Sequence, residues 1–275
     1  MPELVVNGVS LAYDVFGEGR PVVLVPGRGF PRTWWTEQEH VRPYLEAGFS
    51  VLRYDLRGMP PSACPPEPFG VADLVADLSG LLEALDLRDC ALVGYSMGSC
   101  IVQELAAARP DLARAVVMVG TLARQPAWQR TLNEGALELF ATGIEIPQKF
   151  LVGMIFGLLY DPGALTDDAQ VAPFIDELLS LPPWEDPGRS GQWRALAQYR
   201  ADPATLAGIE VPSLVIAFER DLLMPPVLAR EVAATIWNCQ YAELPGGGHW
   251  RLVLDPPEVH IRVLAFLEEV LGGAF

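Results

Sequence analysis

A serine between two glycines lies in residues 94–98, whose sequence is Gly-Tyr-Ser-Met-Gly. The apolar run 90–93 before it predicts a buried strand, and residues 99–109 after it have the apolar spacing of a helix. At such a strand-to-helix turn the glycines permit a tight bend, and the serine hydroxyl is held out as a nucleophile. We therefore predict that Ser96 is a catalytic nucleophile. The alternative is a small-residue turn with a surface serine.

A serine hydroxyl is a poor nucleophile at neutral pH, so it needs a base, and the base needs a carboxylate to orient it. The chain has three histidines. His249 follows three glycines just past the last predicted strand, which favours it as the base. His40, in a predicted surface helix, and His260, within the final helix, are expected to have surface or packing roles. We predict that Asp221, which follows a strand, is the acid; Glu219 is the nearby alternative, and a surface turn carboxylate is the other interpretation.

The elements that would position these residues alternate along the chain. An Asn-Gly turn at 7–8 predicts a hairpin between strands at 4–6 and 10–15. Further strands are expected at 21–25, 50–54, 90–93, 115–119, 211–217 and 240–244, and helices at 34–47, 71–85, 99–109, 226–236 and 257–271. Because parallel strands need crossover connections, this alternation predicts an α/β fold with a mostly parallel sheet and helices on both faces.

The alternation stops after residue 121. From 122 to 207 only helix-like segments follow, broken by glycine and proline and rich in large apolar residues. A helical insertion at the carboxyl edge of a parallel sheet is expected to cover the site. We therefore divide the chain into a first core part at 1–121, a helical cap at 122–207 and a second core part at 208–275.

These features resemble the α/β-hydrolase fold family, in particular its lidded esterases, lactonases and thioesterases. The resemblance rests on residues 94–98, Asp221 and His249, which follow one another in the order that this fold uses. It covers nearly all of the chain outside the predicted cap. It implies an eight-stranded, mostly parallel sheet with helices on both faces and a helical cap.

The resemblance also implies an oxyanion hole made of two backbone N–H groups. In this family one comes from the residue after a His-Gly pair in the loop after the third strand, which here is Arg28. The other would come from Met97, directly after the nucleophile. Pro26 stands where the family usually has histidine, which puts the loop geometry in question more than the backbone donors. Asp55 and Arg57 resemble the family's structural turn after the fourth strand.

Substrate contacts are expected from the same loops and from the cap. The Arg28 side chain could hold a substrate carboxylate through two hydrogen bonds, point into solvent, or pair with a nearby acid. The apolar cap residues would line an acyl pocket or pack the cap's own core. Cys100, one helical turn past Ser96, is expected to be a packed thiol. The predicted substrate-binding residues are Arg28, Tyr95, Phe140, Met154, Phe156 and Trp250.

Composition limits the partners. A formal net charge of −16 and a pI near 4.5 argue against nucleic acid and, more weakly, against an anionic membrane surface. No apolar stretch reaches the roughly 18 residues of a membrane span, and the first eight residues do not resemble a secretory signal. The cysteines at 64, 90, 100 and 239 lack metal-ligand spacing, which favours reduced thiols and a cytoplasmic location. We expect no cofactor and no metal.

The sequence thus predicts a serine hydrolase that cleaves a hydrophobic carboxylic ester, thioester or lactone through an acyl-enzyme on Ser96. A dehalogenase would need a carboxylate at this position, so Ser96 excludes that activity. One alternative is a non-hydrolytic enzyme of the same fold: a cyclase or acyl transferase, an epimerase, a lyase or a perhydrolase. The other is a ligand-binding receptor. Residue types alone leave the substrate and the oligomeric state unknown.

Overall fold

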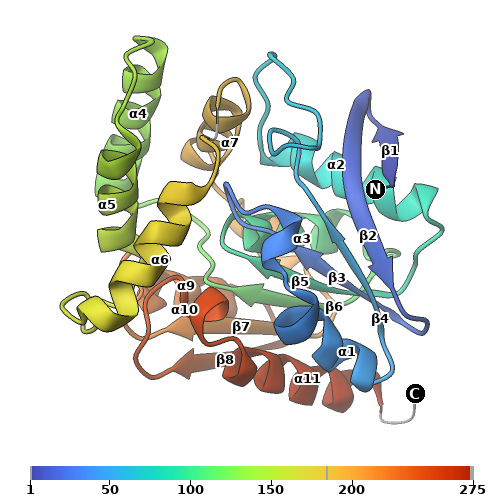
Figure 1. Ribbon diagram of the computed structural model, residues 1–275. Coiled ribbons are helices and arrows are strands. Elements are labelled where there is room, and N and C mark those ends of the chain that lie inside the picture. The colour runs from blue at the N-terminus through green and yellow to red at the C-terminus, as the bar shows by residue number, and fades with distance from the viewer. Residues whose placement is uncertain (1, 184, 273–275) are drawn as a thin grey trace.

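The computed structural model describes residues 2–183 and 185–272 and contains one eight-stranded sheet (Figure 1). Its strands are β1 Glu3–Val6, β2 Val9–Phe16, β3 Pro21–Val25, β4 Ser50–Tyr54, β5 Cys90–Tyr95, β6 Ala113–Val119, β7 Ser213–Phe218 and β8 Cys239–Leu244. They lie in the order β1-β2-β4-β3-β5-β6-β7-β8. β2 pairs antiparallel with β1 and with β4, and every pairing from β4 to β8 is parallel. The predicted mostly parallel sheet is confirmed.

The hairpin predicted at the start of the chain joins β1 to β2, with Val6 paired to Val9. Asn7 and Gly8 form its two-residue turn and have positive φ angles of 49° and 76°. A type I′ turn requires positive φ at both positions, which asparagine tolerates and glycine adopts freely. The local sequence was therefore sufficient to predict this element.

Helices pack on both faces of the sheet (Figure 1). The helical elements are the 3₁₀ helix η1 Arg32–Trp34, the π-helix η2 Glu37–Val41, and the α-helices α1 Arg42–Glu46, α2 Val71–Ala84, α3 Met97–Ala108, α4 Ala127–Ala141, α5 Gln148–Leu159, α6 Asp168–Ser180, α7 Gly188–Ala197, α8 Pro203–Ala207, α9 Pro226–Thr235, α10 Arg251–Leu254 and α11 Pro257–Leu271. Within the ranges described, none of them combines the length and apolarity that a membrane crossing requires.

Alternate residues of the central strands belong to two cores on opposite faces of the sheet. In β3, Val23 and Val25 pack with side chains of α2, α3, α8 and α9. Val22 and Leu24 pack with side chains of α1 and α11. Because both faces are covered, these strands are apolar throughout instead of alternating with polar residues, and this pattern is typical of parallel sheets.

The predicted helix at 34–47 is right only for residues 37–46, where η2 runs directly into α1; Trp34 ends the separate 3₁₀ helix η1, and residues 35 and 36 form the turn between them. Pro43 lies just after the point where the π-helix passes into α1, and proline has no N–H to donate to the preceding turn. Thr36 caps η2 by accepting a hydrogen bond from the Glu39 N–H at 3.3 Å.

His40 is buried at 1% exposure instead of lying on a surface helix, which corrects the prediction of its location. Its Nδ1 lies 2.7 Å from Nε2 of His260, which is also buried. The Tyr44 hydroxyl lies 2.9 Å from the other ring nitrogen of His260. Both histidines therefore have the packing role that was one of the two expected for them.

Between β6 and β7 the described residues form five helices, α4 to α8, and no strand. α4 packs on α7 and α5 on α6, and these four helices lie beyond the carboxyl ends of the central strands (Figure 1). We call α4–α7 the cap helices. α8 differs from them, because it packs against α3 and α9. Its Leu206 belongs to the hydrophobic core between the sheet and the helices α2, α3 and α9. The boundaries at 121 and 207 stay predictions.

Candidate active site

Ser96 lies on the turn between β5 and α3, with a φ of 56° and a ψ of −121°. A residue with a side chain pays a conformational cost for such angles, so the surrounding contacts must enforce them. The glycines of the motif permit those contacts. A Cβ on Gly94 would overlap the carbonyl of Gly98, and a Cβ on Gly98 would overlap the carbonyl of Val25. The tight turn therefore requires glycine at both positions.

The structure brings the three predicted catalytic residues together. The Ser96 Oγ lies 2.9 Å from Nε2 of His249, and Nδ1 of His249 lies 2.6 Å from Oδ2 of Asp221. Their exposed fractions are 6%, 2% and 2%, so the chain of hydrogen bonds is shielded from water. Because an ionised carboxylate only accepts, Nδ1 carries the proton and Nε2 of the neutral ring accepts from the serine hydroxyl.

Asp221 and not Glu219 reaches the histidine. The second oxygen of Asp221, Oδ1, accepts hydrogen bonds from the N–H groups of Leu223 at 2.9 Å and Met224 at 2.7 Å, which fix the carboxylate. The Glu219 carboxylate instead accepts from the Gly246 N–H at 2.7 Å. Glu219 therefore holds the loop that carries His249, and the alternative acid that the sequence left open lies away from the ring.

The histidine loop is also held by Tyr95 and by the cap. The Tyr95 hydroxyl donates to the carbonyl of His249 at 2.7 Å, and the two rings stack with centroids 5.1 Å apart. The N–H of Trp250 donates to the carbonyl of Leu159, the last residue of α5, at 2.8 Å. Tyr95 also lines the cavity, but its hydroxyl is hydrogen-bonded to the histidine loop.

The two predicted oxyanion donors lie on either side of the serine. Met97 is the first residue of α3, and the first N–H groups of a helix have no acceptor within the helix. Arg28 follows Gly27, where an added Cβ would lie 3.0 Å from the Cβ of Ser96, so this loop passes directly beside the nucleophile. The oxyanion role of both N–H groups stays a prediction.

A glutamine of the cap holds the loop that contains Arg28. The N–H of Gly29 donates to Oε1 of Gln192 at 2.9 Å, and Nε2 of Gln192 donates to the carbonyl of Arg57 at 2.9 Å. Asp55 accepts from the N–H of Arg32 at 2.6 Å a little further along the same loop. Gln192 and Asp55 therefore both hold this loop in place, although Pro26 replaces the histidine usual in the family. Sequence reasoning missed Gln192, because no motif surrounds it.

Asp55 and Arg57, which the sequence analysis assigned to a structural turn, both form buried ion pairs. Asp55 pairs with Arg32. Arg57 pairs with Asp77 of α2 through two hydrogen bonds of 2.5 Å. These contacts fasten the loops after β3 and β4 to each other and to α2, which is consistent with a positioning role.

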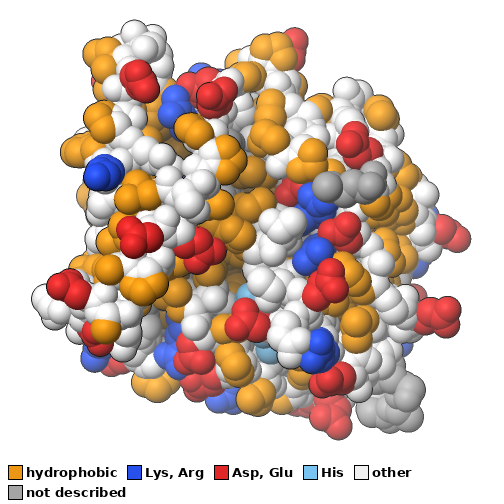
Figure 2. All heavy atoms as spheres, viewed as in Figure 1, with side chains coloured by type: hydrophobic (Ala, Val, Ile, Leu, Met, Phe, Trp, Pro, Cys, Tyr) orange, Lys and Arg blue, Asp and Glu red, His pale blue; other side chains and the backbone are white. Residues whose placement is uncertain are grey.

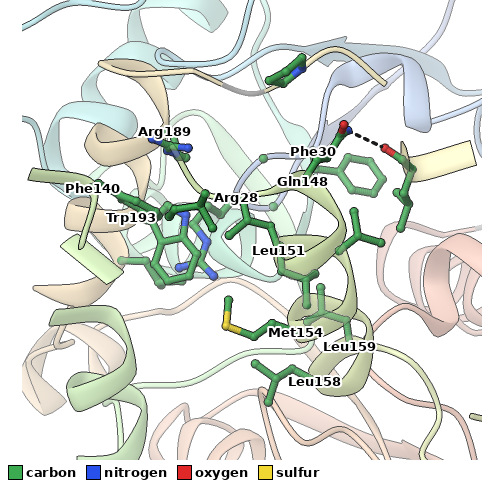
Figure 3. Close-up of a pocket in the computed structure, with 18 of the residues that line it drawn as sticks. Arg28, Phe30, Phe140, Gln148, Leu151, Met154, Leu158, Leu159, Arg189 and Trp193 are labelled. Atoms are coloured by element: carbon green, nitrogen blue, oxygen red, sulfur yellow. Dashed lines mark hydrogen bonds between the residues drawn. The ribbon is translucent and has the colours of Figure 1, made fainter. Parts of the chain in front are cut away.

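A cavity of about 780 Å³ lies between the cap helices and the carboxyl ends of the strands. Ser96 and His249 lie in its wall. Figure 2 shows a hollow beside the cap with hydrophobic side chains exposed in it. Among the predicted substrate-binding residues, the cavity is lined by Arg28, Tyr95, Phe140, Met154 and Trp250. Cap residues that the prediction missed also line it, among them Asn133. Leu151, Leu158 and Trp193 are others (Figure 3).

Phe156 does not line this cavity, which corrects the prediction for it. It is buried against Tyr160, with ring centroids 4.6 Å apart, and against Trp250 at 5.7 Å. Successive helical residues are rotated by about 100°, so Phe156 faces nearly opposite to Met154 on α5. Met154 points to the cavity and Phe156 to a small core within the cap, where Phe174 also packs.

The cysteines take no part in the site. All four are free. Burial raises the pKa of the Cys100 thiol to about 12, so it stays protonated at neutral pH, and it packs in the core of the sheet as predicted. Among the described residues, no three histidine, cysteine or acidic side chains are grouped in a way that could hold a metal ion.

A buried serine–histidine–aspartate chain at the carboxyl edge of a mostly parallel sheet is the arrangement of the α/β-hydrolase fold. A family model described as "Alpha/beta hydrolase family" matches residues 22–261, and the chain belongs to this family. The match extends from β3 through β8 and includes the cap helices.

The chain is similar along its whole length to several bacterial proteins. It is 33% identical over 263 residues to "Putative non-heme bromoperoxidase BpoC" of Mycobacterium tuberculosis, covering 95% of this chain and 99% of that one. The crystal structure of that protein superposes with a TM-score of 0.88 at 32% identity, covering 97% of each chain. "Putative carbamate hydrolase RutD" of Azorhizobium caulinodans is 26% identical over 273 residues, covering 98% of this chain and 99% of that one. The enol-lactonase of Burkholderia xenovorans superposes with a TM-score of 0.80 at 25% identity, covering 97% and 99%.

Proposed function

We propose that this protein is a serine hydrolase that cleaves a carboxylic ester, thioester or lactone with a largely apolar body. The observation that carries the proposal is the chain of hydrogen bonds from Ser96 through His249 to Asp221, with lengths of 2.9 and 2.6 Å, at the wall of an apolar cavity. The three side chains have the nucleophile, base and orienting-acid relation that acyl transfer from an ester needs.

In the first half of the reaction Ser96 Oγ attacks the substrate carbonyl carbon while Nε2 of His249 takes the hydroxyl proton. Asp221 stabilises the resulting imidazolium through its hydrogen bond to Nδ1. The tetrahedral intermediate then collapses, and His249 gives the proton to the leaving oxygen or sulfur. The acyl group is left esterified to Ser96.

In the second half water attacks the acyl-enzyme with His249 again acting as the base, which releases the acid and restores the serine. The N–H groups of Arg28 and Met97 would bind the carbonyl oxygen as it becomes negative. Each such donor typically contributes roughly 3–4 kcal/mol to the stabilisation of the transition state. Neither half of the reaction needs a cofactor, and the partner is a small acyl substrate.

The apolar wall supplied by α5 supports a hydrophobic acyl or alcohol group. Three side chains on one face of that helix, Leu151, Met154 and Leu158, line the cavity (Figure 3). The relatives are consistent with acyl chemistry, since one is named as a carbamate hydrolase and another as an enol-lactonase. A cytoplasmic location stays part of the proposal.

Labelling with a fluorophosphonate tests the nucleophile. Intact-mass spectrometry should show one covalent adduct on the wild type and none on Ser96→Ala, and p-nitrophenyl esters should be hydrolysed only by the wild type. Thioesters and lactones of graded chain length then define the substrate class. Absence of an adduct with both a bulky and a small fluorophosphonate, on folded protein, would reject the proposal in favour of a ligand-binding receptor or a non-hydrolytic enzyme.

A second candidate is perhydrolysis, which the name of the 33% identical relative, "Putative non-heme bromoperoxidase BpoC", favours. If hydrogen peroxide replaced water in the second half of the reaction, the acyl group of Ser96 would leave as a peracid. The assay is bromide oxidation in the presence of peroxide and a carboxylic acid. Ser96-dependent bromide oxidation faster than ester hydrolysis would favour perhydrolysis as the main activity.

A further inference from the structure

Arg28 presents a guanidinium group to the cavity from the loop beside Ser96. Its plane stacks on the ring of Trp193 in α7, with Cζ 3.7 Å from the ring centroid. One N–H of Nη1 donates to Oδ1 of Asn133 in α4 at 3.3 Å. Stacking uses the face of the guanidinium and leaves its edge free for in-plane hydrogen bonds. Figure 3 shows Arg28 next to Trp193 within the cavity wall.

No carboxylate among the described residues forms an ion pair with Arg28. The other arginine that the structure places in the cavity wall, Arg189, pairs with Asp186 at 2.8 Å. Two further acids of the wall, Glu145 and Glu185, are exposed to solvent. Arg28 is therefore a cation inside the cavity whose charge the described protein groups do not neutralise.

Arg28 is only partly exposed, and its partial burial makes this charge costly. Removal of water lowers the pKa of the Arg28 guanidinium to about 10, which still leaves it protonated at neutral pH. Asn133 offers a neutral amide oxygen, which compensates less than an anion would. A ligand carboxylate in the plane of the guanidinium would accept two hydrogen bonds and restore the lost solvation.

We propose that the substrate carries a carboxylate, separate from the bond that is cleaved, which the edge of the Arg28 guanidinium binds while the apolar body lies against α5. The substrate class is therefore a monoester of a dicarboxylic acid or a lactone that bears a carboxylate group. The inference rests on the proposed ester hydrolysis at Ser96 and adds the charged end of the substrate. Arg28 then has two roles: its backbone N–H binds the oxyanion, and its side chain selects substrates that carry a carboxylate.

The test compares two matched pairs of p-nitrophenyl esters. One pair is built on adipic acid and the other on suberic acid, and in each the far end is either the free carboxylate or the carboxamide of the same shape. Charge-assisted hydrogen bonds are stronger than neutral ones, so the wild type should have a kcat/KM about 10- to 100-fold higher for the carboxylate of at least one pair. For each variant we take the ratio of kcat/KM for the carboxylate ester to kcat/KM for the carboxamide ester. A general loss of activity cancels in this ratio.

Three variants locate the preference. Arg28→Met should reduce the ratio to about one or below, since the charge is gone. Arg28→Lys keeps the charge but not the planar fork, so its ratio should lie between those of the wild type and Arg28→Met. Arg189→Met is the matched control: it removes the other arginine of the cavity wall, which is already paired, and should leave the ratio within about twofold of the wild type.

Calorimetry with Ser96→Ala tests the same contact without turnover. Monomethyl adipate should bind this variant at least about tenfold more tightly than the neutral methyl ester of adipamic acid, and adding Arg28→Met should abolish the difference. Thermal unfolding and circular dichroism confirm that each variant is folded.

Failure of the two proposals can be told apart. Ester hydrolysis with no preference for the carboxylate at either chain length, together with equal binding of both calorimetric ligands, would overturn the carboxylate subsite and leave the serine hydrolase in place. No hydrolysis and no fluorophosphonate adduct, together with Arg28-dependent binding of monomethyl adipate, would reject the hydrolase and support the subsite.

Discussion

Replacing Gln192 with leucine should slow catalysis by loosening the loop that carries Arg28. Gln192 is 1% exposed and joins two loops, because its Oε1 accepts from the Gly29 N–H and its Nε2 donates to the Arg57 carbonyl, each at 2.9 Å. Leucine fills much of the same volume but makes neither hydrogen bond. Gly29 directly follows the residue whose N–H we place in the oxyanion hole, so movement there displaces that donor.

The size of the effect follows from these two contacts. Each buried neutral hydrogen bond contributes about 0.5–1.5 kcal/mol net, so the free energy of unfolding should fall by about 1–3 kcal/mol. Complete loss of one oxyanion donor would lower kcat by about 10²- to 10³-fold. Asp55 still holds Arg32 at the far end of the loop, so the donor is displaced and not lost. We therefore expect kcat to fall by about 10- to 100-fold while KM changes little.

Steady-state kinetics on a p-nitrophenyl ester and urea unfolding measure the two effects. The control is Gln103→Leu, since Gln103 is equally buried; it donates to the Leu122 carbonyl at 3.2 Å and to the Tyr199 hydroxyl, and accepts from Thr121 at 3.3 Å, away from the oxyanion loop. The control should lose at least as much stability as Gln192→Leu and keep its kcat. If Gln192→Leu retained kcat within about twofold of the wild type while losing the expected stability, the loop would be positioned by other contacts and our reasoning would be refuted.

Three further predictions concern the triad, the turn and the buried histidines. Asp221→Asn removes the acceptor that selects the histidine tautomer, so kcat on an ester should fall by about 10⁴-fold; a fall smaller than about tenfold would contradict its role. Gly94→Ala places a Cβ against the Gly98 carbonyl and should lower the free energy of unfolding by more than about 2 kcal/mol in urea titrations, whereas an unchanged midpoint would show that the turn can relax. Burial lowers the pKa of His40 to about 4 and that of His260 to about 3, from an ordinary 6.5, so the unfolded chain binds protons first as the pH falls. The free energy of unfolding should then be level above about pH 7 and decrease toward pH 4 by up to about 1.4 kcal/mol per pH unit for each histidine, with a shallower slope in His260→Asn; an equal slope would assign the effect to other groups.

The regular core could be predicted because its signals are local. The strand before Ser96, the helix after it and the final helix from Pro257 to Leu271 occupy nearly the predicted residues. In each case a continuous run or a regular spacing of apolar residues indicates which face of the element is buried. Glycines and prolines at the ends indicate the turns. The helix expected at 34–47 extends only from 37 to 46 and begins as a π-helix, a form that residue types alone do not identify.

The site was predicted in part. Ser96 and His249 each lie in a glycine-rich turn at the edge of the sheet, and that local signal was enough to place them there. Two carboxylates follow β7, and the sequence favoured Asp221 but left Glu219 as an alternative. In the structure Asp221 does so and Glu219 caps the histidine loop. The choice depends on the path of a turn of only three residues, which neither propensity nor periodicity defines.

By itself, the sequence determined the order of strands and helices, the strained turn at Ser96 and the residue types of the triad, because each depends on neighbours a few positions away. Only the tertiary structure decided which face of α5 borders the cavity, that Gln192 holds the oxyanion loop, and that Arg28 lies on Trp193 with no acidic partner among the described residues. These contacts join residues more than a hundred positions apart. Apolar periodicity predicts that a side chain is buried. Which residue it then contacts depends on how the cap packs on the sheet.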